Sequence, residues 1–315
     1  MNLKKITTLT LLIAVIGFSV EVIQLLLLNI DYNFPSFSLV LENGLKPIKL
    51  NMFNVKIFDY YNVTNVGDIN YLNLFFYALA FIGGILFIVS KQKEMRLIRF
   101  IFSLIILQHL LGLFTNFFVL LYNVSEFRQN WFYFSMYVAF NILWVYISYR
   151  VLKELSKIQI LETDEKIQIN QKEDRLVDAP KWQRLFHYIV DNFLCLLLFS
   201  PFSQLFYELG VRGIEEFMGV GASSYIFLFL FSLIYFPFYE TLLGATPGKF
   251  LTRTRVTKNN GDKIDFKVSM IRTLCRFIPL EPISYFGEKG WHDRISNTRV
   301  LKEKHEELSV WTSGS

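Results

Sequence analysis

The sequence predicts an all-α integral membrane protein with six transmembrane helices, and composition and patterning both support this. Of the 315 residues, 53% are hydrophobic and only 19% are charged, against about 45–50% and about 25% in soluble domains. The mean hydropathy is +0.35. The apolar residues form long blocks rather than alternating patterns, and six blocks reach the roughly 20 helical residues that a hydrocarbon core about 30 Å thick requires.

The six predicted spans follow one another along the whole chain. They cover residues 6–28, 71–90, 100–122, 131–149, 185–207 and 223–243. The first block follows two lysines, as a signal peptide would. It has no small-residue cleavage site and is longer than a usual signal core, so we expect an uncleaved span.

Lysine and arginine are distributed unequally between the two sides of the predicted membrane. The segments predicted to be cytoplasmic hold 27 of the 32 basic residues. Positive residues favour the cytoplasmic side, so we expect a multi-pass protein of the cell (plasma or inner) membrane with both termini in the cytoplasm. This asymmetry accounts for the net charge of +5, and nucleic-acid binding is not expected.

The polar stretch 156–180 divides the chain into two parts. It has mixed charge, no aromatic residue and a proline at its end, which is typical of a cytoplasmic linker. The predicted organisation is a four-span domain at 1–155 with an external loop at 29–70, the linker, a two-span domain at 181–302 and a tail at 303–315. Partial alternation in the external loop predicts a small cap of strands.

Two further elements are expected after the last span. Gly244 and Pro247 end the helix, and the alternating "FLTRTRVT" followed by the turn "NNGD" predicts a cytoplasmic hairpin. The next segment, "SMIRTLCRFIPLEPISYF", is too short and too broken by proline to cross a membrane. We expect an interfacial helix whose Arg272 and Arg276 face anionic lipid headgroups.

Three stretches of the second part read "APKWQRLFHYIVD", "YETLLGATPGKFLTRTRVT" and "GWHDRISNTRVL". Together they resemble the RDD family of membrane proteins, and the resemblance covers about residues 178–302. It implies that Arg184, Asp191 and Asp293 are the arginine and two aspartates for which the family is named. It also matches the family's Gly-x-Thr-Pro-Gly-Lys stretch, here Gly244, Thr246, Pro247, Gly248 and Lys249, preceded by the acidic Glu240.

The resemblance implies transport of an unidentified ligand or cation–proton exchange, both of which have been suggested for the family. The alternative is a non-catalytic scaffold or assembly partner, in which the Arg/Asp/Asp set is structural. Its partners would be the lipid bilayer and other membrane proteins or a second copy of the chain.

The residues themselves leave the same alternatives open. On a helix, Arg184, His187, Tyr188, Asp191 and Cys195 share one face and form a polar stripe. A carboxylate within a bilayer costs at least about 2.5–3.5 kcal/mol, so Asp191 requires a reason to be there. The stripe either handles ions or protons, with His187 bonded to Asp191, or it bonds to a neighbouring helix or to the hairpin.

Other acidic and polar residues have candidate partners as well. Glu240 forms either a carboxylate pair with Asp191 or a local salt bridge with Lys249 or Arg253, and Asp293 is expected to receive Arg184. Glu21 lies in the external third of the first span and is expected to reach the interface. The polar residues within the remaining spans predict interhelical hydrogen bonds; they are Gln108, His109, Asn116 and Asn141.

Catalytic and metal chemistry are not expected. Cys195 and Cys275 form no disulfide or metal pattern, the four histidines lack zinc spacing, and no nucleophile motif is present. The sequence therefore predicts a protein that is not an enzyme and that binds no cofactor.

Overall fold

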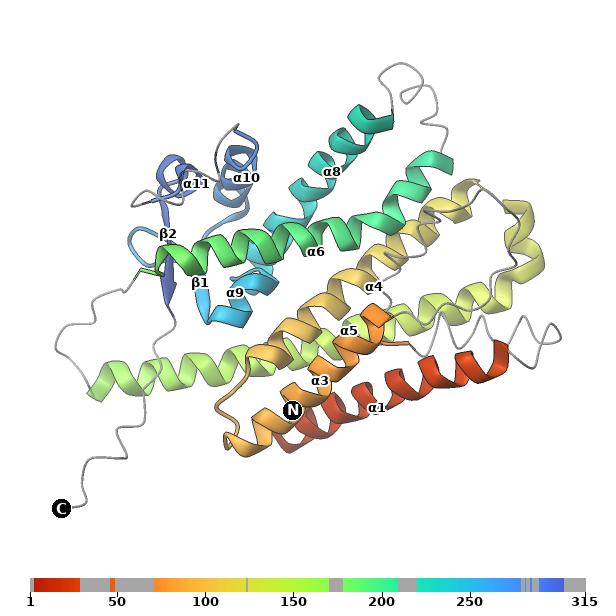
Figure 1. Cartoon of the computed structure of the whole chain (residues 1–315), viewed down its shortest axis with the longest axis horizontal. Helices are drawn as coiled ribbons and strands as arrows, with labels where there is room; N and C mark the ends of the chain where they lie inside the picture. Colours follow the sequence, from red (N-terminus) through yellow and green to blue (C-terminus); the bar gives the residue numbers. More distant parts are fainter. Residues whose placement is uncertain are drawn as a thin grey trace. The chain divides into compact units, whose positions relative to one another are not determined.

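A computed structural model describes residues 3–28, 46–48, 71–122, 124–169, 178–208, 220–278, 281, 284 and 289–302. They are mostly helical (Figure 1). The elements are α1 (Leu3–Leu28), α3 (Tyr71–Val89), α4 (Arg96–Tyr122), α5 (Val124–Ile169), α6 (Lys181–Glu208), α8 (Val220–Pro237), the π-helix η2 (Phe238–Leu243), α9 (Pro247–Thr252), β1 (Thr254–Lys258), α10 (Phe266–Cys275), α11 (Trp291–Ile295) and β2 (Thr298–Lys302).

The chain divides into two compact units. The first unit comprises Met1–Gln171 and Val190–Ser232, and the second comprises Lys172–Ile189 and Leu233–Ser315. Each of the six predicted spans falls on helix in the structure. Among the described residues, three helices are long and apolar enough to cross a membrane, over Leu3–Ile23, Leu72–Val89 and Arg96–Phe114, and Leu228–Leu243 is apolar but shorter.

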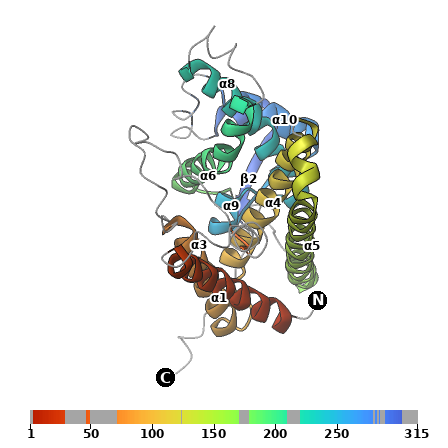
Figure 2. The same ribbon diagram turned by 90° about the vertical axis from the view of Figure 1, so that its right-hand side faces the viewer.

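In the first unit consecutive helices pack on one another, α1 against α3, α3 against α4 and α4 against α5. Figure 2 shows α1 and α3 side by side, in red and orange. Their close approach depends on glycine. A Cβ on Gly17 would lie 2.1 Å from the ring of Tyr77, and one on Gly84 would lie 2.7 Å from Leu11. Small residues at such crossings allow the two backbones to approach, as is common in membrane helices.

Helix α5 extends well beyond the predicted fourth span. It continues to Ile169, so residues 156–169 are helical where a linker was expected. No proline or glycine lies between residues 151 and 179, so nothing in the sequence ends the helix there. The remainder of the expected linker before Asp178, the tail 303–315 and the external loop apart from 46–48 lie outside the described residues.

In the second unit a proline reshapes the end of the last apolar helix. Pro237 lies within the helix and cannot donate a backbone hydrogen bond, and the π-helix η2 begins immediately after it. Gly244 ends η2 in the left-handed conformation, with φ of 76°. Pro247 then occupies the first position of α9, where its missing N–H costs nothing.

The predicted hairpin is replaced by a longer-range pairing. The turn after β1 is present, with Gly261 at φ of 89°, but only one isolated bridge, Thr257 to Lys263, follows it. The described partner of β1 is β2, antiparallel and in register from Thr254–Lys302 to Lys258–Thr298. The "FLT" of the expected first strand belongs to α9, because Pro247 starts a helix there.

Candidate functional site

A carboxylate in η2 is surrounded by three cations. Lys249 Nζ donates to Glu240 Oε1 at 3.0 Å, Arg276 Nη2 donates to the same oxygen at 2.8 Å, and Arg272 Nε donates to Oε2 at 3.2 Å. The hydroxyl of Ser269 donates to Oε2 as well, at 2.9 Å. Glu240, Lys249 and Arg272 are all buried, so these are pairings away from water.

Local sequence explains how these groups converge. The wide turn of η2 turns Glu240 inward, and α9 begins a few residues later and carries Lys249 on its inner side. Arg272 and Arg276 are four residues apart at the end of α10 and therefore share a face. The carboxylate of Asp265 caps the start of that helix by accepting from the N–H of Val268.

The same arginine connects Glu240 to a second carboxylate. Arg272 Nη1 donates to Asp293 Oδ1 at 2.5 Å and also to the hydroxyl of Thr298. Arg184 Nη1 lies 4.0 Å from the other oxygen of Asp293. Asp293 and Arg184 are buried too. Arg184, Glu240, Lys249, Arg272, Arg276 and Asp293 are called the charge network below.

His292 adds a titratable group beside the network. Its Nδ1 is hydrogen-bonded to Glu281 at 2.5 Å and its Nε2 lies 3.5 Å from Asp293. Burial lowers the pKa of the His292 ring, against the opposing effect of Asp293 and Glu281. Burial alone would raise the pKa of the Asp293 carboxyl, but His292, Arg272 and Arg184 hold it well below its usual value.

Comparison with known protein families identifies this part of the chain. The model of the RDD family matches residues 179–288. The chain therefore contains an RDD family domain. The matched range includes Arg184, Asp191, Glu240, Thr246 and Lys249, and Asp293 follows five residues after its end. Comparison with curated proteins and with solved structures gives no match.

The start of the RDD domain lies against the end of β2. Ala179 N–H donates to Val300 O at 2.8 Å, and Arg299 Nε donates to Asp178 at 3.0 Å. Arg184 Nε in turn donates to the carbonyl of Ala179 at 3.0 Å. The arginine that begins the RDD motif thus contacts both its own helix start and Asp293.

The structure brings most of the predicted site residues together in the second unit. The expected local salt bridge of Glu240 with Lys249 is present, and Thr246 accepts from Lys249 Nζ at 3.3 Å. His187 Nε2 is hydrogen-bonded to the hydroxyls of Thr252 and Thr254, the latter at 3.1 Å. Asp191 is buried, with 2% exposure, and is grouped with the first unit.

Arg272 and Arg276 were wrongly expected to face lipid headgroups. Arg272 is wholly buried on Glu240 and Asp293, and Arg276 contacts Glu240 and lies 3.8 Å from the ring centre of Phe236. An unpaired carboxylate buried in the protein is far less stable than a lipid headgroup in contact with water, so the two arginines pair with the buried carboxylates. In the sequence, both arginines share one helix face with the polar Ser269 and Thr273, and this pattern could have shown that they face the protein. No comparable pattern pointed to Glu281 or His292.

A second polar cluster lies in the first unit. The non-helical residues Lys46–Ile48, with a bend at Pro47, are buried there. Lys46 Nζ lies 3.0 Å from Glu21 Oε1, which also accepts from Asn73 at 2.9 Å. Glu21 is therefore buried in an ion pair within the protein.

The backbone of this segment is held by two further side chains. The hydroxyl of Tyr77 donates to Ile48 O at 2.9 Å and accepts from Ile48 N–H. His109 Nε2 is hydrogen-bonded to Pro47 O at 3.0 Å, and its Nδ1 to Asn141 at 2.7 Å, an interhelical bond of the expected kind. Among the described residues, no group of three His, Cys, Asp or Glu side chains is placed to hold a metal ion.

Proposed function

We propose that the RDD domain is a non-catalytic membrane scaffold, in which Arg184, Asp191 and Asp293 are structural. The observation that supports this is the pairing within the charge network. Glu240 is neutralised by three cations and Asp293 by Arg272 and Arg184, all of them buried. Such a set fixes the C-terminal segments around the end of the last apolar helix.

An ion-exchange role would need a carboxylate that alternates between a proton and a cation. Asp293 has a depressed pKa, so it stays ionised at neutral pH and releases no proton there. Its counter-ions are side chains that cannot diffuse away. Removing one partner of a buried pair leaves an unpaired buried charge and typically costs about 3–5 kcal/mol of stability. A loss of stability of this size is what a structural role of these residues predicts.

The scaffold would sit in the cell membrane with six spans and both termini in the cytoplasm. The six helices that contain the predicted spans support this, together with the basic residues of the segments predicted to be cytoplasmic. Its partners would be other membrane proteins or a second copy of the chain.

Transport or cation–proton exchange is the second candidate function, and the first unit favours it. The non-helical segment Lys46–Ile48 is buried with Glu21 from α1 and Tyr77 from α3. Non-helical backbone among membrane helices is tolerated where protein or a water-filled cavity surrounds it, and it marks binding sites in transporters. Ionisable residues inside a membrane are often functional.

Reconstitution in liposomes separates the two candidates. The full chain is placed in vesicles containing a pH-sensitive dye, and a sodium gradient is imposed. We expect no sodium-dependent proton movement above that of protein-free vesicles. In the same preparation, Asp293→Asn is expected to lower the unfolding temperature, because Arg272 loses a buried partner.

Two variants locate the activity if proton movement is seen. Loss in Glu21→Gln alone would place transport in the first unit, and loss in Asp191→Asn would make the RDD aspartate functional. Asp178→Asn, which changes a half-buried carboxylate of the same domain, is the matched control. Flux abolished by Asp191→Asn and kept by Asp178→Asn overturns the scaffold proposal.

A further inference from the structure

Helix α10 is amphipathic in the reverse sense to a helix of a water-soluble protein. Its inner face carries Ser269, Arg272 and Thr273, all wholly buried. Its outer face is almost entirely apolar. Phe266 is 63% exposed and Leu274 48%, and Phe277, just after the helix, is 45% exposed.

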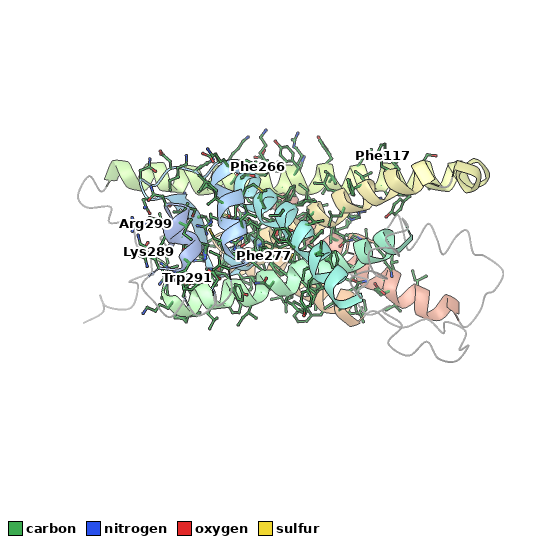
Figure 3. All side chains as sticks on the ribbon, turned by 90° about the horizontal axis from the view of Figure 1, so that it is seen from above. Phe117, Phe266, Phe277, Lys289, Trp291 and Arg299 are labelled. Carbon is green, nitrogen blue, oxygen red and sulfur yellow. The ribbon has the colours of Figure 1, made fainter. Side chains whose placement is uncertain are left out.

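The helical positions show that this is one continuous face. At 100° per residue, Phe266, Met270, Ile271 and Leu274 fall on one side of α10, and the buried Ser269 and Arg272 fall on the other. Phe277 and Ile278 lie in the turn after the helix and are also exposed. Figure 3 shows Phe266 and Phe277, which lie towards opposite ends of this segment. Lys267 is the one charged side chain on the outer face.

The short helix α11 shows the same reversal. His292 and Asp293 point into the second unit, and Trp291 and Ile295, four residues apart, are exposed. Two neighbouring helices therefore direct their polar groups inward and their large apolar groups outward. Water would make this arrangement unfavourable, because the hydrophobic effect removes apolar surface from water and leaves charges solvated.

The inner face of α10 ties the helix to the end of an apolar segment. Arg272 and Arg276 contact Glu240, which lies near the end of Leu228–Leu243. If that segment crosses the membrane, α10 lies at the depth where it leaves the hydrocarbon. Exposed basic residues lie on or beside the two helices, namely Lys267, Lys289 and Arg294, with one exposed acid, Asp265, at the start of α10. Lysine and arginine at such positions extend to anionic headgroups while their stems stay in apolar surroundings.

We infer that α10 and α11 form a lipid-binding surface embedded in the cytoplasmic leaflet. Phe266, Leu274, Phe277 and Trp291 face acyl chains, and Lys267, Lys289 and Arg294 meet anionic headgroups. Lys267, Lys289 and Arg294, which lie outside the charge network, thus make the headgroup contact that was expected of Arg272 and Arg276. The inference goes beyond a scaffold role and holds for a transporter equally.

Depth-dependent quenching tests the inference on the full chain. Leu274→Cys is labelled with bimane and reconstituted in vesicles of phosphatidylcholine and phosphatidylglycerol. The matched control is Lys263→Cys, an exposed polar position in the turn after β1 of the same unit. Both native cysteines are buried, so the labelled unsubstituted chain gives the background signal. A second outer-face variant, Phe277→Cys, is used if Leu274→Cys fails to fold.

Two quenchers report on the two possible environments. We expect lipid carrying a doxyl group high in the acyl chain to quench the Leu274→Cys probe several-fold more than the Lys263→Cys probe, and aqueous iodide to do the reverse. Equal iodide quenching at both positions would show that water covers α10 and would overturn the inference. A Leu274→Cys probe reached by neither quencher would show that protein, and not lipid, covers the helix, and this too would overturn it.

Discussion

Arg272 has one guanidinium group and two carboxylate partners. It donates through Nε to Glu240 and through Nη1 to Asp293, so it connects η2 with α11. Neither carboxylate belongs to Arg272 alone, since Lys249 and Arg276 also neutralise Glu240 and Arg184 also faces Asp293. A pairwise account of the family's arginine and aspartate is therefore incomplete, and a third residue decides how they respond to substitution.

Exchanging the charges of Arg184 and Asp293 makes this testable. Each single variant, Arg184→Asp or Asp293→Arg, is expected to destabilise the protein, because each strands buried charge. In the double variant an arginine at position 293 would face Arg272. We therefore expect the double variant to be no more stable than the singles, as measured by thermal unfolding of the detergent-solubilised chain followed by tryptophan fluorescence.

The control for this exchange is a partly exposed ion pair on α5. Lys157 and Glu154 lie 3.5 Å apart, and swapping them is expected to change the free energy of unfolding by no more than about 1 kcal/mol. Recovery of wild-type stability in the Arg184 and Asp293 double variant would contradict a three-residue arrangement. It would make the two residues an isolated pair.

The lowered pKa of His292 predicts that the stability of the fold depends on pH. The folded ring has a pKa below that of the unfolded ring, which is near 6.5. Between the two values the unfolded chain binds the extra proton, so stability is full above about pH 6.5 and is lost as the pH falls below it. From pH 7 to 5 this loss amounts to at most about 2 kcal/mol.

The comparison variant for the pH series is His292→Gln. It should lose less stability than the wild type between pH 7 and 5 when both are followed by urea unfolding. The depressed pKa of Asp293 has the same sign at lower pH: its contribution is present above the unfolded value of about 3.9 and is lost below it. Identical slopes for both chains from pH 7 to 5 would contradict a neutral buried His292.

At the scale of elements, the α1–α3 pair gives a prediction about packing. A side chain at Gly17 would collide with the ring of Tyr77, whose hydroxyl holds Ile48. Gly17→Leu is therefore expected to destabilise the protein by about 1–3 kcal/mol through overpacking, measured as a fall in unfolding temperature. Val15→Leu, on the exposed side of the same helix, should have little effect. Equal effects of both would argue against close packing at Gly17.

Sequence patterns predicted elements better than the pairings between them. Long apolar blocks predicted helices at all six positions, because a 20-residue apolar run has few other solutions. The end of α5 was missed because mixed charge was taken to indicate a linker, although no residue there breaks a helix. The partner of β1 was missed because β2 lies some 40 residues further along the chain, and a turn signal reports only on its immediate neighbours.

Site residues were predicted in the same uneven way. Proximity in sequence favoured the Glu240–Lys249 pair, and the family motif pointed to Arg184 with Asp293. Arg272 and Arg276 were assigned to the wrong face, because an amphipathic pattern shows that two faces differ but not which of them faces the protein. The burial of Glu240 decides that question, and only the fold shows it.

At the scale of the whole molecule, the compact units and the family match divide the chain differently. Val190–Ser232 groups with Met1–Gln171, although the RDD match runs from residue 179 to 288. Most of α6 and of α8 is thus grouped with the apolar helices of the first unit, and the end of α8 is grouped with the C-terminal elements that hold the charge network. This division follows environment more closely than it follows chain order.

The pairing of β2 with the residues before α6 affects how the segment from Asp178 to Leu301 can be joined to other polypeptides. Its beginning and its end are neighbours, since Asp178 bridges to Leu301 and Ala179 donates to Val300. A segment whose ends meet can be inserted into, or appended to, another polypeptide as a cassette, because the host chain is interrupted at a single point. Gene fusion could therefore attach such a module to unrelated membrane helices without redesigning either component.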